Sequence, residues 1–331
     1  MRVAVIGAGS WGTAVASLVC RNVPTVLWAR RPDVAAEIAQ EHVNRRYLAG
    51  FELPHSLEAT ADLEQAVSRA DVLVIGVPSH GFRETVAQLA PYVRPWIPVV
   101  SLTKGLEQGS MLRMTQILGE LLPGHPAGVL TGPNLAKEIM SGQAAASVIG
   151  MEDLVVAEAL QRVFATGLYR VYTNHDVVGC EIGGALKNVI AIATGMAEAL
   201  SVGDNTRALV MTRGLSELTR LGLAMGGELA TFAGLAGLGD LLATCISPHS
   251  RNRHVGEQLG RGKTIDEVIA AMSMVAEGVK TTAVVMALAK QHGVEMPIVE
   301  EMYAVLYEGR SAAEAYRGLR RRKSGHERDS G

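Results

Sequence analysis

The sequence predicts an α/β fold, with a doubly wound parallel sheet in the first half of the chain and a C-terminal all-α domain in the second half. Three observations lead to this prediction. Short apolar runs alternate with helical segments as far as Tyr172, a glycine-rich turn follows the first of these runs, and no strand pattern follows Tyr172. Alternating β and α segments favour a parallel sheet that helices cover on both faces. The 331 residues are sufficient for two domains.

The first element, residues 2–6, is a short β-rich run that leads into a glycine motif. Gly7, Gly9 and Gly12 form the pattern G-x-G-x-x-G, and an apolar helical segment begins at Thr13. Gly7 permits the tight turn, Gly9 lets a pyrophosphate approach the backbone, and Gly12 lets the helix pack close to the strand. The free N–H groups of the helix N-terminus then bind phosphate. The motif in this position predicts a Rossmann-type dinucleotide-binding domain.

The same stretch superficially resembles a secretory signal peptide, because residues 3–20 carry no charge behind Arg2. Three glycines, Trp11 and three hydroxyl residues interrupt the apolar run, so a strand, turn and helix explain it better. Elsewhere we find no run that is long and apolar enough to span a bilayer, and we expect no membrane insertion.

The residues after the second predicted strand, 25–29, bear on the choice of cofactor. An acidic residue here would bind the ribose 2′-hydroxyl of NAD and repel a 2′-phosphate. This chain has Arg30 and Arg31 instead, with Asp33 lying beyond Pro32. Paired arginines suit a 2′-phosphate, so we expect NADP(H) to be accepted. If the arginines belong only to a solvated turn, NAD(H) stays open as the cofactor.

Polar residues follow several of the later predicted strands. These strands are expected at residues 71–77, 99–102, 128–131, 147–150 and 169–172. Ligands of such sheets bind at the carboxyl ends of the strands. Lys104 and Asn134 follow strand ends, so both should face the cleft. A competing interpretation makes Asn134 the cap of a helix that begins at Leu135.

Helical periodicity fills the second half of the chain. We expect residues 1–174 to form the dinucleotide-binding domain, 175–319 an all-helical substrate domain, and 320–331 a basic, disordered tail. Thr264 and Glu267 have the spacing of a capping box. Helices are expected at 177–200, 206–225, 241–245, 252–259, 265–272, 280–292, 297–308 and 311–319.

The longest predicted helix carries one charged side chain between Glu181 and Glu198, which is Lys187. Its neighbours at helical spacing are mostly small, among them Gly183 and Gly184. Small neighbours leave room for a ligand to approach the amine. The alternative is that Lys187 extends from a buried helix to water.

A second polar constellation lies further along the chain. Residues 234–240 form a glycine-rich turn that ends in Asp240. Ser250 should cap the short helix that opens with Arg251 and Asn252. An arginine in the first helical turn opposes the helix dipole, and a bound anion explains it better than an exposed basic turn does.

Composition argues against several classes of function. The formal net charge of −2 gives no general reason to expect nucleic acid or an acidic membrane as a partner. Cys20, Cys180 and Cys245 are odd in number and far apart, so neither disulfides nor a zinc site are expected, and a reducing cytosol fits best. The histidines do not cluster at metal-ligand spacing, and we expect no metal.

Seven segments of the chain form an ordered set: GAGSWGTA (7–14), SLTKG (101–105), TGPNLAKE (131–138), EIGGALKNVIAIATG (181–195), GLAGLGDLLATC (234–245), SPHSRNRHVG (247–256) and AEGVKT (276–281). Together they resemble the prokaryotic NAD(P)-dependent glycerol-3-phosphate dehydrogenases, whose order and spacing they keep from residue 3 to about residue 310. The resemblance implies reversible reduction of dihydroxyacetone phosphate to sn-glycerol 3-phosphate, which feeds glycerophospholipid biosynthesis, and a cytoplasmic homodimer.

The resemblance also implies roles for individual residues. Lys187 would be the proton donor and acceptor, with Lys104 and Asp240 beside it in the catalytic centre. The substrate would be lined by Lys104, Gly132, Asn134, Lys187, Asp240, Ser250, Arg251 and Asn252. The cofactor would be lined by the glycine motif and by Ser10, Trp11, Arg30, Arg31, Lys104, Ala136, Arg251, Val275 and Glu277. One departure is Asn134-Leu135, where Ser-Phe is expected in many relatives.

The chemistry agrees with these residues. Hydride from the nicotinamide reaches a ketone carbon, and the ketone oxygen needs a proton and a positive neighbour, both of which the Lys187 ammonium supplies. We hypothesise that Lys104 and Lys187 face each other across the substrate and that Asp240 partly offsets their repulsion. Residues 250–252 would hold the substrate phosphate and so orient the carbonyl.

Two other functions are compatible with the fold. One is a related dehydrogenase that acts on another hydroxy acid or a sugar acid phosphate, against which the segments 234–245 and 250–253 argue. The other is a nucleotide-sensing binding protein in which Lys187 and Asp240 are structural, because a fold alone does not fix a function.

Overall fold

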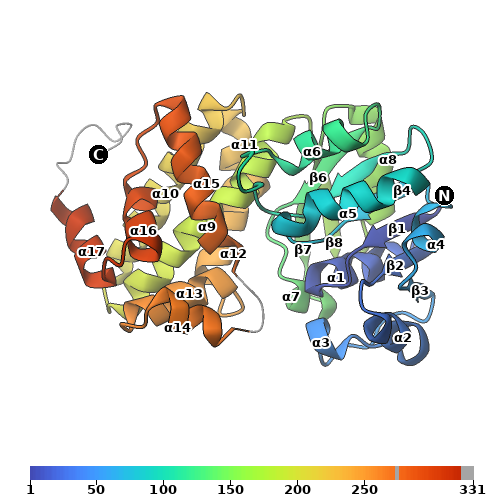
Figure 1. The fold of residues 1–331 in the computed structure, drawn as a ribbon, viewed down its shortest axis with the longest axis horizontal. Helices are drawn as coiled ribbons and strands as arrows, with labels where there is room; N and C mark the ends of the chain where they lie inside the picture. Colours follow the sequence, from blue (N-terminus) through green and yellow to red (C-terminus); the bar gives the residue numbers. More distant parts are fainter. Residues whose placement is uncertain (273–275, 322–331) are drawn as a thin grey trace. The chain divides into compact units, whose positions relative to one another are not determined.

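The computed structural model describes residues 1–272 and 276–321, with the side chains of residues 320 and 321 left out. The chain forms two compact units. Unit 1 comprises Met1–Lys104 and Leu112–Val177, and unit 2 comprises Gly105–Met111 and the described residues from Val178 onward. The short segment Gly105–Met111 thus groups with the helical unit although the sheet domain surrounds it in sequence. Figure 1 shows the elements of each unit.

Unit 1 is built on a sheet that has eight strands within the described residues, in the order β3-β2-β1-β4-β5-β6-β7-β8. All neighbours pair in parallel except β6 and β7, where Thr131 pairs with Val148 in antiparallel register. The expectation of an entirely parallel sheet is therefore wrong at this pair. Between β6 and β7 the chain forms only one short helix, α7 (Ala136–Met140). This helix is too short to carry the chain back to the end of the sheet at which β6 begins, as a parallel pair would require. The strands are β1 (Val3–Ile6), β2 (Thr25–Trp28), β3 (Leu57–Thr60), β4 (Val72–Ile75), β5 (Val99–Ser101), β6 (Ala127–Thr131), β7 (Ala145–Met151) and β8 (Tyr169–Asn174).

The strands were predictable where both faces of the sheet are covered. All residues of β1 and β4 are buried, which explains why their sequences are continuous apolar runs. Strand β3 lies at the sheet edge, and its sequence LEAT is only partly buried. Its mixed polarity is the reason that the sequence analysis did not find it.

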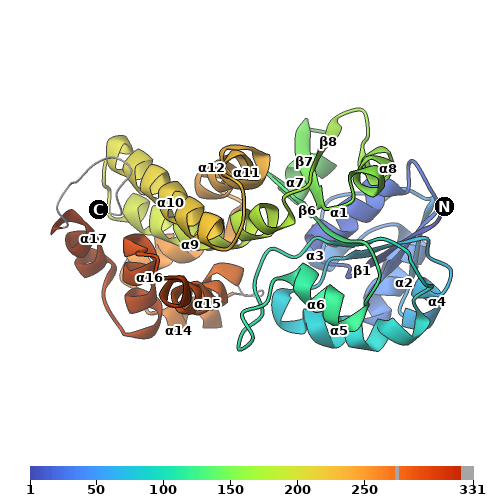
Figure 2. The same ribbon diagram turned by 90° about the horizontal axis from the view of Figure 1, so that it is seen from above.

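Helices cover both faces of the sheet. One apolar core joins the sheet to α1 (Ser10–Val19) and α8 (Leu154–Phe164). A second core on the other face involves α4 (Leu63–Val67), α5 (Phe82–Leu89) and α6 (Met114–Leu121). Figure 2 shows these two helical layers with the sheet between them. Unit 1 is therefore the doubly wound layer structure that the sequence predicts.

From Val178 onward, the regular secondary structure of the described residues of unit 2 is helical, and α9 (Val177–Ala199) runs through the core of the unit. By length and composition α9 qualifies as a candidate membrane span, contrary to the sequence analysis. However, 94% of its most apolar window is buried inside the protein, as in the core helix of a folded domain. The other helices are α10 (Asp204–Ala224), α11 (Leu229–Ala233), α12 (Asp240–Ile246), α13 (Arg251–Gly260), α14 (Ile265–Ala270), α15 (Glu277–His292), α16 (Pro297–Tyr307) and α17 (Ala312–Arg321).

Glycines let α9 approach its neighbours at backbone distance. A Cβ atom at Gly195 would lie 2.1 Å from the carbonyl oxygen of Arg253, and one at Gly256 would lie 2.0 Å from that of Ile192. A Cβ atom at Gly183 would lie 2.5 Å from the carbonyl oxygen of Ala236. The small residues of α9 thus serve close packing within unit 2, where the sequence analysis expected them to make room for a ligand.

Helix ends and turns give mixed outcomes for the predictions. The capping box of Thr264 and Glu267 is present. Asn134 does not cap α7, because Leu135 is the N-cap residue and no side chain caps it. The predicted glycine-rich turn before Asp240 is a π-helical segment, η3 (Leu235–Gly239). Helix α17 continues to Arg321, and the rest of the predicted disordered tail lies outside the described residues.

Candidate active site

The glycine motif of unit 1 forms a tight turn between β1 and α1. Gly7 has a φ of +117°, and a Cβ atom there would lie 2.7 Å from the carbonyl oxygen of Gly76. A Cβ atom at Gly12 would lie 2.0 Å from the carbonyl oxygen of Gly7, whereas Gly9 has no atom within 4 Å of that position. Gly9 is the N-cap of α1 and provides no side-chain cap. The turn therefore combines close packing, open space at Gly9 and helix N–H groups that can bind a phosphate.

Two arginines and an aspartate follow β2. Arg30 and Arg31 are exposed, and Arg31 donates two hydrogen bonds to Asp33, with N···O distances of 3.1 and 2.7 Å. The hydrogen bond from Arg31 lowers the pKa of Asp33. A cofactor 2′-phosphate would therefore have to compete with Asp33 for Arg31. The sequence places Asp33 beyond Pro32, but its ion pair with Arg31 is not among the predictions, although the spacing of two residues was the available signal.

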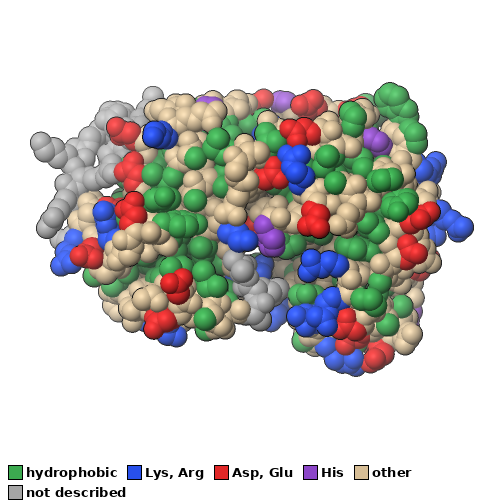
Figure 3. All heavy atoms as spheres, viewed as in Figure 1, with side chains coloured by type: hydrophobic (Ala, Val, Ile, Leu, Met, Phe, Trp, Pro, Cys, Tyr) green, Lys and Arg blue, Asp and Glu red, His purple; other side chains and the backbone are tan. Residues whose placement is uncertain are grey.

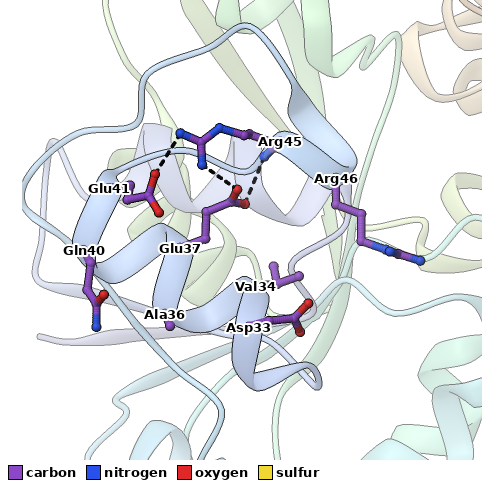
Figure 4. Close-up of a pocket in the computed structure, with 8 residues that line it drawn as sticks. All are labelled: Asp33, Val34, Ala36, Glu37, Gln40, Glu41, Arg45 and Arg46. Atoms are coloured by element: carbon purple, nitrogen blue, oxygen red, sulfur yellow. Dashed lines mark hydrogen bonds and ion pairs between the residues drawn. The ribbon is translucent and has the colours of Figure 1, made fainter.

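A surface pocket lies beside this segment, between α2 (Pro32–Glu41) and α3 (Arg45–Leu48). Figure 4 shows Arg45 bridging Glu37 and Glu41, with Arg46 pointing away from them. In Figure 3 side chains of both signs gather over these two helices. Because α2 supplies carboxylates to Arg45, the pocket itself is a poor place for a phosphate group.

The carboxyl ends of β5 and β6 bring three predicted residues together. The Lys104 ammonium donates to the carbonyl oxygen of Gly132 at 2.7 Å. Gly132 has a φ of +121°, a conformation that favours glycine. Asn134 follows on the same turn, and its Nδ2 atom is buried without a hydrogen-bond partner among the described residues. This strand end thus presents an amine and an amide, as expected for the ligand edge of the sheet.

Lys187, in unit 2, is buried, with 5% of the residue exposed. Its Nζ atom lies 3.0 Å from Asp240 Oδ1 and donates to Thr244 Oγ1 at 2.6 Å. The alternative in which Lys187 extends to water is therefore wrong. Thr244 donates its own hydrogen to the Asp240 carbonyl oxygen at 2.7 Å, so a lone pair of its oxygen is available to the amine. Thr244 is not among the residues predicted from the sequence, where its only signal is that it lies one helical turn after Asp240.

The ammonium of Lys187 has three hydrogens, and two of them are directed at Asp240 and Thr244. Within the part of the chain that the structure describes, the third has no partner. Asp240 is itself 2% exposed, so the two charges neutralise each other in a setting where an unpaired charge is costly. The arrangement holds an amine in one orientation with one hydrogen available to a ligand.

The start of α13 has the predicted cap. Ser250 Oγ accepts from the backbone N–H of Arg253 at 3.2 Å. Arg251 is exposed in the first turn, and Glu277 at the start of α15 attracts it electrostatically. Val275, which was predicted to contact the cofactor, lies outside the described residues.

Asn252 connects three helices of unit 2. Its Nδ2 atom donates to Asn188 Oδ1 at 2.9 Å, and its Oδ1 atom accepts from the backbone N–H of Gly278 at 2.9 Å. It therefore joins α13 to α9 and α15, and each end of its amide already has a protein partner. Asn188 is not among the residues predicted from the sequence, because its position directly after Lys187 is the only feature that points to a role for it.

A phosphate-binding glycine turn on a doubly wound sheet, with a buried amine on a helical second unit, defines the class of two-domain nicotinamide-dependent dehydrogenases. Residues 2–157 match the N-terminal domain, and residues 176–317 the C-terminal domain, of NAD-dependent glycerol-3-phosphate dehydrogenase. The chain belongs to the NAD-dependent glycerol-3-phosphate dehydrogenase family.

Individual relatives span almost the whole chain. Glycerol-3-phosphate dehydrogenase [NAD(P)+] 2 of Sphingopyxis alaskensis is 56% identical over 100% of this chain and 99% of its own length. Glycerol-3-phosphate dehydrogenase [NAD(P)+] 1 of Mycobacterium tuberculosis is 56% identical over 98% of this chain and 96% of its own. The crystal structure of glycerol-3-phosphate dehydrogenase from Coxiella burnetii has a TM-score of 0.92 and 36% identity, and covers 97% of this chain and 99% of its own.

Proposed function

We propose that the protein catalyses the reversible NAD(P)H-dependent reduction of dihydroxyacetone phosphate to sn-glycerol 3-phosphate. The observation that carries this proposal is the buried Lys187 ammonium, held by Asp240 and Thr244 with one hydrogen left for a substrate oxygen. Family membership supplies the substrate and cofactor class.

Lys187 is the proton donor in reduction and the acceptor in oxidation. As hydride reaches the carbonyl carbon, negative charge develops on the oxygen, and the free N–H of Lys187 stabilises and then protonates it. Asp240 and Thr244 keep the amine in place, so little reorganisation accompanies the reaction. The nicotinamide supplies the hydride, and the protein supplies orientation and the proton.

The substrate phosphate binds at the start of α13. Ser250, Arg251 and Asn252 open this helix, where the positive end of the helix dipole and a guanidinium favour an anion. Because the side chains of Ser250 and Asn252 already bond within unit 2, we assign the main attraction to Arg251 and to the backbone. Holding a remote phosphate orients the carbonyl for reaction.

The remaining residue assignments complete the proposal. We assign residues 1–174 to cofactor binding and 175–319 to the substrate domain. Lys104, Gly132 and Asn134 contact the substrate at the strand ends. The cofactor contacts Gly7, Gly9, Gly12, Ser10, Trp11, Arg30, Arg31, Lys104, Ala136, Arg251, Val275 and Glu277.

We further propose a cytoplasmic homodimer whose product feeds glycerophospholipid biosynthesis. The three cysteines are buried and not joined in disulfides, which agrees with a reducing compartment. The two relatives from Sphingopyxis alaskensis and Mycobacterium tuberculosis come from bacteria, and the product carries the glycerol backbone that phospholipids need.

An oxidation assay of reduced nicotinamide tests the function. The purified full chain should oxidise NADPH or NADH only when dihydroxyacetone phosphate is present, and should form sn-glycerol 3-phosphate. Parallel reactions with 2-keto acids and with sugar acid phosphates test the rival dehydrogenase function. Faster oxidation with one of these, or none with any substrate, would refute the proposal.

A further inference from the structure

Three side chains of unit 1 form a hydrogen-bonded chain that ends at the strand-end turn and is buried at Ser147 and Tyr169. The hydroxyl of Tyr169, on β8, bonds the hydroxyl of Ser147 on β7, and Ser147 bonds Oδ1 of Asn134. Ser147 is fully buried, and Tyr169 is 2% exposed. Because Tyr169 pairs with Ala145 in the parallel register, two residues before Ser147, both side chains point to the same face of the sheet.

The direction of this chain follows from counting hydrogens. Each hydroxyl has a single hydrogen, and a carboxamide oxygen can only accept. Ser147 must therefore donate to Asn134 Oδ1, which leaves the Tyr169 hydroxyl to donate to Ser147. Burial raises the pKa of Tyr169, so this hydroxyl keeps its hydrogen at physiological pH. The opposite direction would leave the buried Tyr169 hydrogen without an acceptor, at a cost in free energy.

The chain fixes which way the Asn134 amide faces. With Oδ1 engaged by Ser147, the amide turns its Nδ2 group the other way, and Nδ2 is buried without a partner among the described residues. A buried donor without an acceptor is unfavourable, and such groups in native proteins often serve a ligand. On the same turn, the Gly132 carbonyl holds the Lys104 ammonium.

We propose that Tyr169 and Ser147 are positioning residues that orient the Asn134 carboxamide, so that its Nδ2 group donates to an oxygen of the bound triose phosphate. The inference rests on the proposed function and deepens it. A serine in place of Asn134 would present a short hydroxyl, whereas the longer amide has two chemically different ends and has to be oriented. Ser147 and Tyr169 supply that orientation from behind the site.

Steady-state kinetics of Ser147→Ala and Tyr169→Phe test the proposal. Ser147→Ala removes the donor to Oδ1, so the KM for dihydroxyacetone phosphate should rise about ten-fold, with kcat within two-fold of wild type and an unchanged KM for NADPH. Tyr169→Phe keeps the ring beside Trp11 and removes only the hydroxyl, so the same KM should rise about three-fold.

A double-mutant cycle separates positioning from general structural damage. Asn134→Ala alone should raise the substrate KM, and Asn134→Ala with Ser147→Ala should raise it no further, because Ser147 acts through Asn134. Ser17→Ala removes a buried serine hydrogen bond to Thr13 in α1, and Tyr172→Phe removes an exposed hydroxyl on β8; both should leave the substrate KM unchanged. Melting temperatures identify any unfolded variant.

The outcomes distinguish this inference from the proposed function. If wild type does not reduce dihydroxyacetone phosphate, the proposed function fails. If wild type is active but folded Ser147→Ala keeps its substrate KM, or its effect adds fully to that of Asn134→Ala, the positioning inference fails while the function stands.

Discussion

At the scale of single residues, the candidate chemistry depends on how Lys187 is held. Its sequence environment predicted an unusual amine, and Asp240 was predicted as its counter-charge. A contact between Thr244 and Lys187 was not predicted, because one threonine in an apolar helix has many structural explanations. Only the structure shows that its hydroxyl hydrogen is bonded to the preceding turn, so that its oxygen accepts from the amine.

Removing that acceptor tests the arrangement. Thr244→Val keeps the shape but loses the hydrogen bond to Lys187, so kcat should fall about ten- to a hundred-fold while the KM for NADPH stays the same. Thr194→Val is the matched control, since Thr194 is buried in α9 and bonds the Ile190 carbonyl. Equal kcat values for Thr244→Val and Thr194→Val in steady-state kinetics would contradict the role of Thr244 in holding Lys187.

Glu217 gives a prediction of pH dependence. It is buried in α10 and accepts from the backbone N–H groups of Ile298 and Val299, at 2.8 and 3.3 Å. Burial raises its pKa from 4.5 to about 7, an effect that these two hydrogen bonds and Arg220 oppose. Between pH 4.5 and pH 7, Glu217 is therefore protonated in the native state and ionised in the unfolded chain.

The sign follows from proton linkage. A raised native pKa contributes stability that is complete below the unfolded pKa and is lost as the pH rises through the native pKa. The free energy of unfolding should therefore fall by about 2–3 kcal/mol between pH 4.5 and pH 7 on account of this group. Urea unfolding across this range measures it, and Glu217→Gln should abolish that part of the slope. An unchanged slope in the variant would show that Glu217 is not its source.

At the scale of elements, periodicity predicted most helices and the buried strands, because burial on one or both faces constrains the residues directly. Three features lay beyond it. The edge strand β3 has no apolar run, β7 reverses direction although its own sequence carries no sign of this, and η3 is a π-helix although its glycines suggest a turn. Each depends on the neighbours of a segment, and a single sequence does not specify them.

The crossing of α9 and α13 gives a prediction at this scale. Gly256→Ala would place a methyl group 2.0 Å from the Ile192 carbonyl oxygen, so the helices must separate. The free energy of unfolding should fall by about 1–3 kcal/mol, and activity should fall with it because Lys187 and Arg251 lie on these two helices. Chemical denaturation and the activity assay measure both effects.

Gly119→Ala provides the control for that change. Gly119 lies inside α6, and a Cβ atom there would meet no atom within 4 Å. The substitution should stabilise the protein by up to about 1 kcal/mol, because alanine favours the helix. Equal effects of the two substitutions would mean that α9 and α13 are not packed as described.

At the scale of the whole molecule, the chain separates two tasks. The sheet unit contains the glycine turn between β1 and α1 and the strand ends that carry Lys104 and Asn134. The helical unit contains the Lys187 amine and the start of α13. The family and the domain classes were recognisable from the motifs, because their order and spacing extend over nearly the whole chain. The hydrogen-bond partners of Asn134 and Asn252 were not recognisable from the sequence, since these partners are distant along the chain.

The kinetics of Lys187→Ala test the central claim most directly, with dihydroxyacetone phosphate and NADPH as substrates and NADPH affinity measured separately by fluorescence. Because Asp240 would be left buried without its partner, Lys187→Ala with Asp240→Asn is measured beside it. We predict that turnover falls at least about a thousand-fold in both proteins while NADPH affinity is unchanged, and that small primary amines partly restore turnover. Turnover near that of wild type, or equal losses of turnover and NADPH affinity, would contradict the role of Lys187.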